Sequence, residues 1–210
     1  MWNTILFDLD GTLTDPKQGI TTAVGIALEH FGIHESPDNL TRFIGPPLME
    51  AFPEFYGFTT AQAEEAIQVF QEYFGRQGWR ENNPYEGIAE FLGGLKSAGK
   101  RLIVATSKPE VFARRILDHF DLSQYFFAVC GAPLDERKGA EKIKIIRKAL
   151  AFCEDTPIMV GDRKHDIEAA HALGLRAIGV LYGYGSREEL TGCGADYLAE
   201  DLSALQTLLY

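Results

Sequence analysis

Short apolar segments alternate with helix-like segments from residue 101 to the end of the chain, and this alternation is what most restricts the fold. The strand-like segments are LIVAT, FFAVC, PIMVG, AIGVL and DYL. The helix-like segments that follow the first four span residues 111–119, 138–150, about 166–173 and a short stretch around Glu188, and a closing helix follows the fifth. Strands that alternate with helices through short connections form a mostly parallel sheet covered on both faces. The sequence therefore predicts an α/β fold.

One further strand-like run, Thr4–Phe7, is separated from this series by about ninety residues, far more than one crossover connection needs. Two stretches of the intervening sequence have apolar residues at helical spacing, and a double proline, Pro46–Pro47, interrupts regular structure between them. The two apolar sets are Ile20, Val24, Ala27, Leu28, Phe31 and Ala63, Ala66, Ile67, Phe70, Tyr73, Phe74. We predict a small helical cap at residues 16–83, inserted into a core made of residues 1–15 and 84–210. A helix from Pro84 to Ala98, capped by Asn83, should return the chain to the sheet.

Composition and charge exclude several classes of function. The chain has 210 residues, is 46% hydrophobic and has a formal net charge of −10. This charge disfavours nucleic acid and acidic membrane surfaces as partners, and a small ligand is the better prediction. Three widely spaced cysteines argue against a disulfide framework or a zinc site, and no signal-peptide or membrane-spanning pattern is evident. We therefore expect a cytoplasmic protein, by default a monomer, with a dimer left open.

The segment after the first strand carries two acids, Asp8 and Asp10, followed by Gly11 and Thr12. Acids two residues apart project to the same side of extended backbone, and Gly11 breaks the strand at the sheet edge where α/β proteins bind ligands. Such a pair can supply a nucleophile and a proton donor, or can hold a hard cation such as Mg²⁺. Taken alone, the pair is equally compatible with two solvated acids in a turn.

Polar residues also follow the later strands. Thr106, Ser107 and Lys108 follow LIVA, the run from Gly161 to Asp166 follows PIMV, and Arg137–Lys138–Gly139 precedes a helix. Because the carboxyl ends of parallel strands lie at one edge, these groups should converge on Asp8 and Asp10. Acids, a hydroxyl and a cation around one point are the groups that phosphoryl transfer requires.

In these residues the chain resembles the haloacid dehalogenase superfamily of phosphohydrolases. The four motifs that carry the resemblance are Asp8-Leu-Asp10-Gly-Thr12, Thr106, Lys138 and Gly161-Asp162-Arg-Lys-His-Asp166, in the order typical of that superfamily. The segments FIGPPL, VGDRKHD and IGVLYGYGS are similar to nucleotidase-like members of its phosphoglycolate phosphatase-like branch. The resemblance implies a Rossmann-like core with a small helical cap, and it covers essentially the whole chain.

The resemblance also implies roles for the acids. Asp8 would attack phosphorus and become an aspartyl phosphate, and Asp10 would protonate the leaving alcohol and then activate water. Asp8, the backbone carbonyl of Asp10 and Asp162 would bind Mg²⁺, with Asp166 as a direct or water-mediated ligand.

The same resemblance implies that Thr106 and Lys138 hold the phosphate, with Ser107 as a secondary contact, and that Thr12 orients Asp10. Lys108 and Lys142 are the alternatives to Lys138. Lys138 is favoured because it is expected to open a helix, whereas Lys108 precedes Pro109 and is expected at the rim.

Weaker signals have ordinary structural explanations beside functional ones. His165 is more simply the solvated start of a helix than a metal ligand, because Mg²⁺ prefers oxygen. The run Gly183–Ser186 is more simply a turn than a phosphate loop, and Tyr182 and Tyr184 are expected to pack. In the cap, Arg42, Gly45 and Pro46 are candidate specificity residues, with a solvated helix end as the alternative for Arg42.

The sequence thus predicts a Mg²⁺-dependent phosphomonoester hydrolase that acts on a small phosphorylated metabolite, with phosphoglycolate or a nucleoside monophosphate favoured. A sugar phosphomutase of the same family is the first alternative. A non-enzymatic domain that is phosphorylated on Asp or that binds phosphate is the second, although signalling receivers are much shorter. A dehalogenase is disfavoured, because Asp10 supplies an acid/base that carbon–halogen chemistry does not need there.

Overall fold

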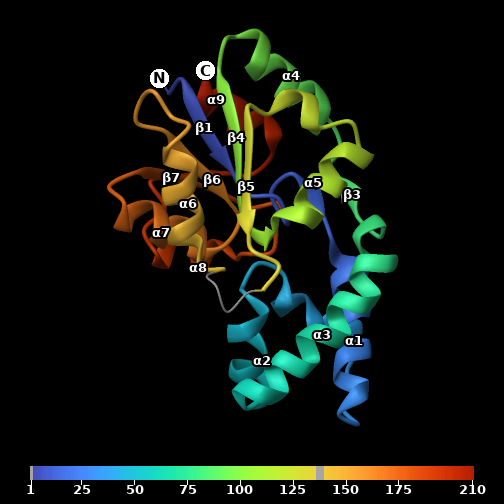
Figure 1. Ribbon diagram of the computed structural model, residues 1–210. Helices are drawn as coiled ribbons and strands as arrows, with labels where there is room; N and C mark the ends of the chain where they lie inside the picture. The colour runs from blue at the N-terminus through green and yellow to red at the C-terminus, as the bar shows by residue number, and fades with distance from the viewer. Residues whose placement is uncertain (1, 136–139) are drawn as a thin grey trace.

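The computed structural model describes residues 2–135 and 140–210, and a six-stranded parallel sheet forms their core (Figure 1). The strands lie in the order β5-β4-β1-β6-β7-β8. Their bounds are β1 Thr4–Phe7, β4 Arg101–Pro109, β5 Ala128–Ala132, β6 Ile158–Gly161, β7 Arg176–Val180 and β8 Tyr197–Ala199. Every neighbouring pair in this sheet is parallel, which confirms the predicted α/β class.

The first strand is central because it is apolar on both faces. Phe7 pairs with Val104 of β4 on one side and with Val160 of β6 on the other. Ile5 and Phe7 belong to one hydrophobic cluster, whereas Leu6 between them belongs to a second cluster. Alternate residues of a strand face opposite sides of the sheet, so each cluster is the core of one face. The carboxyl end of β1, where Asp8 follows, is thereby fixed at the middle of the sheet edge.

Helices cover both faces of the sheet. Helices α4 (Ile88–Ser97), α5 (Glu110–His119) and α9 (Leu202–Leu209) contribute buried residues to the first cluster. Helices α6 (Lys142–Leu150), α7 (Lys164–Ala172) and α8 (Arg187–Gly192) contribute to the second. A short 3₁₀ helix, η3 (Ser123–Tyr125), precedes β5. None of the described helices combines the length and the apolar character needed to cross a bilayer.

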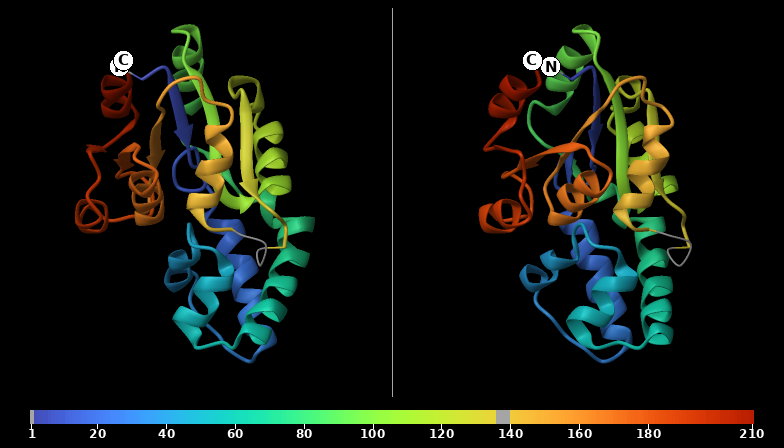
Figure 2. Two further views of the ribbon diagram at one scale, coloured as in Figure 1. Left: turned by 60° about the vertical axis from the view of Figure 1, so that its left-hand side comes forward. Right: turned by 90° about the vertical axis from the view of Figure 1, so that its left-hand side faces the viewer.

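A helical segment lies beyond the carboxyl ends of the strands in all three views (Figures 1 and 2). It contains α1 (Lys17–His30), η1 (Pro37–Phe43), α2 (Leu48–Tyr56), α3 (Thr60–Arg76) and η2 (Gly78–Arg80). Where the chain leaves and re-enters the core, β2 (Thr14–Asp15) pairs antiparallel with β3 (Asn83–Pro84). We call residues 16–83 the cap, as in the sequence prediction.

Two local predictions differ from the structure. Asn83 and Pro84 form β3 instead of opening a helix, because they pair with the strand that leaves the core. Helix α4 begins at Ile88, after Gly87 in the left-handed region (φ 80°). In the cap, the segment 43–48 was predicted to be irregular, but only residues 44–47 are non-helical, because η1 ends at Phe43 and α2, which was missed, begins at Leu48.

The described cysteines, Cys130, Cys153 and Cys193, are free thiols. Burial raises the pKa of each thiol, to about 11 for Cys153, so none of them is poised as a nucleophile.

Candidate active site

Asp8 lies at the carboxyl end of β1 and is 5% exposed. Its backbone N–H donates to the Val160 carbonyl at 2.9 Å, which extends the pairing of β1 with β6, and its Oδ1 accepts the Leu9 N–H at 2.8 Å. The turn that follows depends on Gly11, which has a φ of +79°. A Cβ at Gly11 would also overlap the Asp162 carboxylate, so this glycine permits both the turn and the close approach of Asp162.

Three buried carboxylates meet at this point. Asp8, Asp162 and Asp166 each offer an oxygen, and these oxygens lie within 4.8 Å of one another. Burial raises the pKa of Asp162 well above its usual value, and repulsion from Asp166 and Asp8 adds to the effect. Three clustered anions need a cation, and carboxylate oxygens are the donors that Mg²⁺ prefers. These residues therefore fit the magnesium site that the sequence predicted, whereas the Asp10 carboxylate is not part of the cluster.

Hydrogen bonds from neighbouring residues hold the Asp162 and Asp166 carboxylates in place. The Asp162 carboxylate accepts the Tyr184 N–H at 2.8 Å and the Thr12 hydroxyl at 3.4 Å. The Asp166 carboxylate accepts the Arg163 N–H at 3.1 Å at the start of α7. A Cβ at Gly183 would overlap the Asp162 side chain, so the turn after β7 packs directly against Asp162. Thr12, expected to orient Asp10, contacts Asp162 instead.

The lysine that the structure places among these acids is Lys142. Its Nζ lies 2.8 Å from Asp8 Oδ1 and 2.7 Å from Asp166 Oδ1, and its side chain is 4% exposed. Burial lowers the pKa of Lys142, but Asp166 and Asp8 outweigh burial and the net pKa is raised. Lys142 is therefore a buried cation in contact with the predicted nucleophile.

The predicted phosphate lysine, Lys138, lies outside the described residues. Lys138 was preferred because it was expected to open a helix, but Glu141 is the N-cap and α6 begins at Lys142. The predicted start of this helix was wrong, and the same criterion selects Lys142. The signal that could have found it is the position of Lys142 at the head of the apolar repeat Ile143, Ile145, Ile146 and Ala149.

Lys108 is the second buried cation of the site. Its Nζ lies 2.5 Å from Asp10 Oδ2 and 4.7 Å from the centre of the Phe74 ring, and its side chain is 5% exposed. The expectation that Lys108 lies at the rim was wrong, because β4 continues through Pro109 and carries Lys108 inward. Burial and the Asp8 charge raise the pKa of Asp10 despite Lys108. Lys108, and not Thr12, orients the Asp10 carboxylate.

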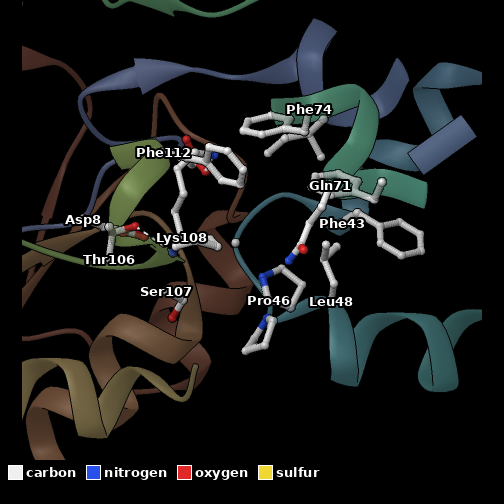
Figure 3. Close-up of a pocket in the computed structure, with 16 residues that line it drawn as sticks. Asp8, Phe43, Pro46, Leu48, Gln71, Phe74, Thr106, Ser107, Lys108 and Phe112 are labelled. Carbon is white, nitrogen blue, oxygen red and sulfur yellow. Dashed lines mark hydrogen bonds and ion pairs between the residues drawn. The ribbon is translucent and has the colours of Figure 1, made fainter. Parts of the chain in front are cut away.

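A pocket with a cavity volume of about 60 Å³ lies between this site and the cap (Figure 3). Thr106 and Ser107 line it from the core, and Gly45 and Pro46 line it from the cap, so the structure brings these four candidate residues together. Arg42 does not line it. That side chain is exposed and stacks over Phe55 at 4.6 Å and Tyr56 at 5.1 Å on the cap surface. The prediction that Arg42 contacts the substrate is therefore not supported by its position.

The remaining sequence candidates have structural partners. The Tyr184 hydroxyl donates to Asp15, and the Tyr182 hydroxyl donates to the Thr12 carbonyl at 3.1 Å, so both tyrosines pack as expected. His165 is half-buried at the start of α7, and burial lowers its pKa. Arg163, which the sequence did not single out, spans core and cap: it donates to the Ile44 carbonyl and pairs with Glu189 at 3.0 Å.

The site thus combines a buried aspartate at the end of the first strand, a lysine in contact with it and a cluster of acids beside it. The family described as haloacid dehalogenase-like hydrolase matches residues 5–180. This chain belongs to that family. It is an enzyme of the phosphatase type, and its relatives and structural neighbours bear names of that type.

Among the relatives of this haloacid dehalogenase-like hydrolase is a 5'-nucleotidase from Pseudomonas aeruginosa. It is 45% identical over 98% of this chain and 94% of its own length. The tyrosine-protein kinase PtkA from Mycobacterium tuberculosis is 41% identical over 86% of this chain, which aligns with 62% of PtkA. The crystal structure of a predicted phosphatase from Clostridium acetobutylicum has a TM-score of 0.96 and 43% identity, covering 100% of this chain and 98% of the other.

Proposed function

We propose that this chain is a Mg²⁺-dependent phosphomonoester hydrolase that works through an aspartyl phosphate on Asp8. The observation that carries the proposal is the arrangement at Asp8, where one carboxylate oxygen contacts the Lys142 ammonium and the carboxylates of Asp162 and Asp166 lie alongside. The substrate is a small phosphorylated metabolite, with phosphoglycolate and nucleoside monophosphates the leading candidates. The resemblance to nucleotidase-like phosphatases and the relative named 5'-nucleotidase support this choice.

In the first step, Asp8 attacks phosphorus and the bond from phosphorus to the leaving oxygen breaks. Lys142 and Thr106 hold phosphate oxygens, and Asp10 donates its proton to the departing alcohol. The raised pKa of Asp10 favours the protonated form that this step needs. In the second step, Asp10 takes a proton from water, which attacks the aspartyl phosphate and releases inorganic phosphate and free Asp8.

Asp8, Asp162 and Asp166 would hold the magnesium ion, with the Asp10 carbonyl as a further ligand by the family resemblance. When bound, the ion offsets the repulsion between the anionic phosphate and the anionic nucleophile. The chain's own Lys142 provides part of the same neutralisation, because its ammonium already contacts Asp8.

The test is phosphate release by the purified protein with Mg²⁺, compared with Asp8→Asn and with Asp38→Asn as control. Asp38 is an exposed acid of the cap that pairs with Lys17. We expect multiple turnovers for the wild type and the control, and a loss of more than roughly a thousandfold for Asp8→Asn. An acid-stable phosphate adduct, mapped to Asp8 by mass spectrometry after denaturing quench, should appear only when Asp8 is present.

Undiminished turnover by Asp8→Asn would refute the assignment of the nucleophile. Isomerised sugar phosphate in place of free phosphate would indicate the phosphomutase alternative. A phosphorylated Asp8 that forms once without turnover would indicate the signalling alternative.

A further inference from the structure

The pocket has two chemically different ends. The charged side chains that line it, Asp8, Asp10 and Lys108, all lie at the core end, together with Thr106 and Ser107. The described cap residues that line it are apolar apart from Gln71; they are Ile20, Phe43, Gly45, Pro46, Pro47, Leu48, Phe70 and Phe74. In the proposed function the phosphate is bound at the core end, which places the leaving group at the cap end.

Aromatic rings form one wall of the cap end. Phe70 and Phe74 of α3 stack with ring centres 5.2 Å apart and 12° between their planes. Phe112 of α5 meets the edge of Phe74 at 5.2 Å and 74°. Figure 3 shows Phe74 and Phe112 beside Lys108, with Gln71, Pro46 and Leu48 on the other side of the space. A planar ring inserted here would exchange water contacts for ring and methylene contacts.

The cations near the pocket are already paired. Lys108 is shared between the Asp10 carboxylate and the face of Phe74. Arg163 pairs with Glu189 and donates to the Ile44 carbonyl, and Arg42 stacks on Phe55 and Tyr56 outside the pocket. Among the described residues, none of these three cations is left to receive a second anionic group of a substrate. Because no cation is among the described residues that line the cap end, a carboxylate on the leaving group would lose hydration there without gaining a charged partner from them.

We propose that the pocket selects phosphate monoesters whose leaving group carries a planar, uncharged ring, and that Phe74 and Gln71 determine this selection. The inference rests on the proposed function and specifies its substrate class. Phe74 lines the cap end, and because its faces contact Lys108 and Phe70, it offers its ring edge to the ring of the substrate. Gln71 lines the cap end and donates its amide N–H to the Leu134 carbonyl at 3.0 Å, which leaves its amide oxygen to accept a hydrogen bond from a ring substituent.

A planar ring can come from a nucleoside base or from an aryl ester, and the experiment separates the two. The rate constant kcat/KM is measured with Mg²⁺ for two matched pairs, uridine 5'-monophosphate against ribose 5-phosphate and phosphotyrosine against phosphoserine, and for 2-phosphoglycolate. We expect at least one ring-bearing ester to exceed its ring-free partner and phosphoglycolate by thirtyfold or more. The pair that shows the difference identifies the source of the ring. Equal rates within both pairs, or phosphoglycolate as the best substrate, would overturn the proposal.

Two variants test the named residues. Phe74→Leu keeps an apolar side chain but removes the ring, and it should lower kcat/KM about tenfold for the ring-bearing ester and less than threefold for its ring-free partner. Gln71→Lys adds a cation to the cap end, and it should raise the rate for phosphoglycolate relative to the ring-bearing ester about tenfold. Phe127→Leu is the control and changes a ring that is 61% exposed on the core. It should leave unchanged the kcat/KM of the ring-bearing ester relative to its ring-free partner and relative to phosphoglycolate. Equal effects of Phe74→Leu on both members of a pair would contradict the role of Phe74.

Binding of the free leaving groups distinguishes failure of this inference from failure of the proposed function. Uridine, tyrosine and glycolate are titrated into the Mg²⁺-loaded protein by calorimetry. If no ester is hydrolysed, the proposed function is wrong, and tighter binding of uridine or tyrosine than of glycolate still supports the ring pocket. If esters are hydrolysed but the ring compounds bind no better than glycolate, the ring pocket is wrong and the hydrolase proposal stands.

Discussion

At the scale of single residues, the site is organised by two lysines that neutralise different acids. Lys142 contacts Asp8 and Asp166, and Lys108 contacts Asp10. The proposed nucleophile, Asp8, and the proposed proton donor, Asp10, thus each contact a different lysine. This pairing explains how five ionisable side chains share a space from which water is nearly excluded.

We expect Lys142→Met to lower kcat/KM by at least a hundredfold, because the variant removes the cation from Asp8 and leaves two buried acids unpaired. Lys144→Met is the matched control: Lys144 lies two residues further along the same helix, is half-exposed and pairs with Glu141 at 2.9 Å. Steady-state phosphate release measures the effect, and circular dichroism checks that each variant is folded. A folded Lys142→Met enzyme within tenfold of wild type would rule out this role for Lys142.

Gly183 supports Asp162 by its lack of a side chain. A Cβ there would overlap the Gly11 carbonyl and the Asp162 side chain, whereas a Cβ at Gly192 would meet nothing within 4 Å. Gly183→Ala should therefore cost about 1 to 3 kcal/mol of stability and weaken Mg²⁺ binding, since the carboxylate must shift. Urea unfolding and Mg²⁺ titration of Gly183→Ala and Gly192→Ala measure both effects. Equal behaviour of the two variants would show that Asp162 is not held by this contact.

At the scale of elements, each helix that positions the site begins at a residue with an identifiable role. Helix α6 begins at Lys142, and α7 begins after Arg163, whose N–H donates to Asp166. Helix α3, which carries Gln71 and Phe74 over the pocket, begins with a reciprocal capping box between Thr59 and Gln62. The start of α3 is therefore fixed by local sequence, independently of the site.

Thr59→Ala should destabilise the protein by about 1 kcal/mol, because the Gln62 N–H at the start of α3 loses the Thr59 hydroxyl as its acceptor. Thr60→Ala, one residue further into the helix, is the control and should change stability by less than about 0.5 kcal/mol. Chemical denaturation gives both values. Because α3 is long and its buried face is unchanged, KM should stay within twofold of wild type. A larger change in KM would mean that the position of the cap depends on the capping box of Thr59 and Gln62.

At the scale of the whole molecule, the cap is held over the core by polar contacts at separate points. Arg163 donates to the Ile44 carbonyl, Gln71 to the Leu134 carbonyl at 3.0 Å, and Arg115 to the Gly75 carbonyl at 3.1 Å. These contacts and the Phe74–Phe112 pair place the cap pocket over the carboxylates. The balance of charge at the site is likewise a property of the assembled molecule.

Burial raises the pKa of Asp166 from 3.8 to about 6, against the opposing effect of Lys142. In the metal-free protein the folded state therefore binds this proton more tightly than the unfolded state does, and stability should fall as pH rises from about 4 to about 6. The contribution is at most about 3 kcal/mol. Asp166→Asn removes it, so in chelator the variant should gain stability relative to wild type between pH 4.5 and pH 7. Thermal unfolding of Asp166→Asn and wild type at pH 4.5 and at pH 7 measures this gain. An equal difference in unfolding temperature between the two proteins at both pH values would contradict the prediction.

Mg²⁺ should reverse the trend for the wild type. Added at pH 7, the ion binds the ionised carboxylates of the folded state and should raise the unfolding temperature in proportion to the logarithm of its concentration. Asp166→Asn should respond more weakly, because one of the clustered acids is lost.

The sequence by itself determined the parallel sheet, the presence of helices between its first two strands in the chain, and the position of the acids, because these depend on local patterns. The apolar run Thr4–Phe7 followed by Asp8 and Asp10 predicts a strand that ends in acids, and parallel strands bring Asp162 and Thr106 to the same edge whatever their separation in sequence. Only the tertiary structure decided which side chains meet. Lys142 contacts Asp8, Lys108 contacts Asp10, Thr12 contacts Asp162, and Arg42 lies outside the pocket. The direction of a long side chain depends on which charges and rings surround it after folding, and a linear pattern does not contain that information.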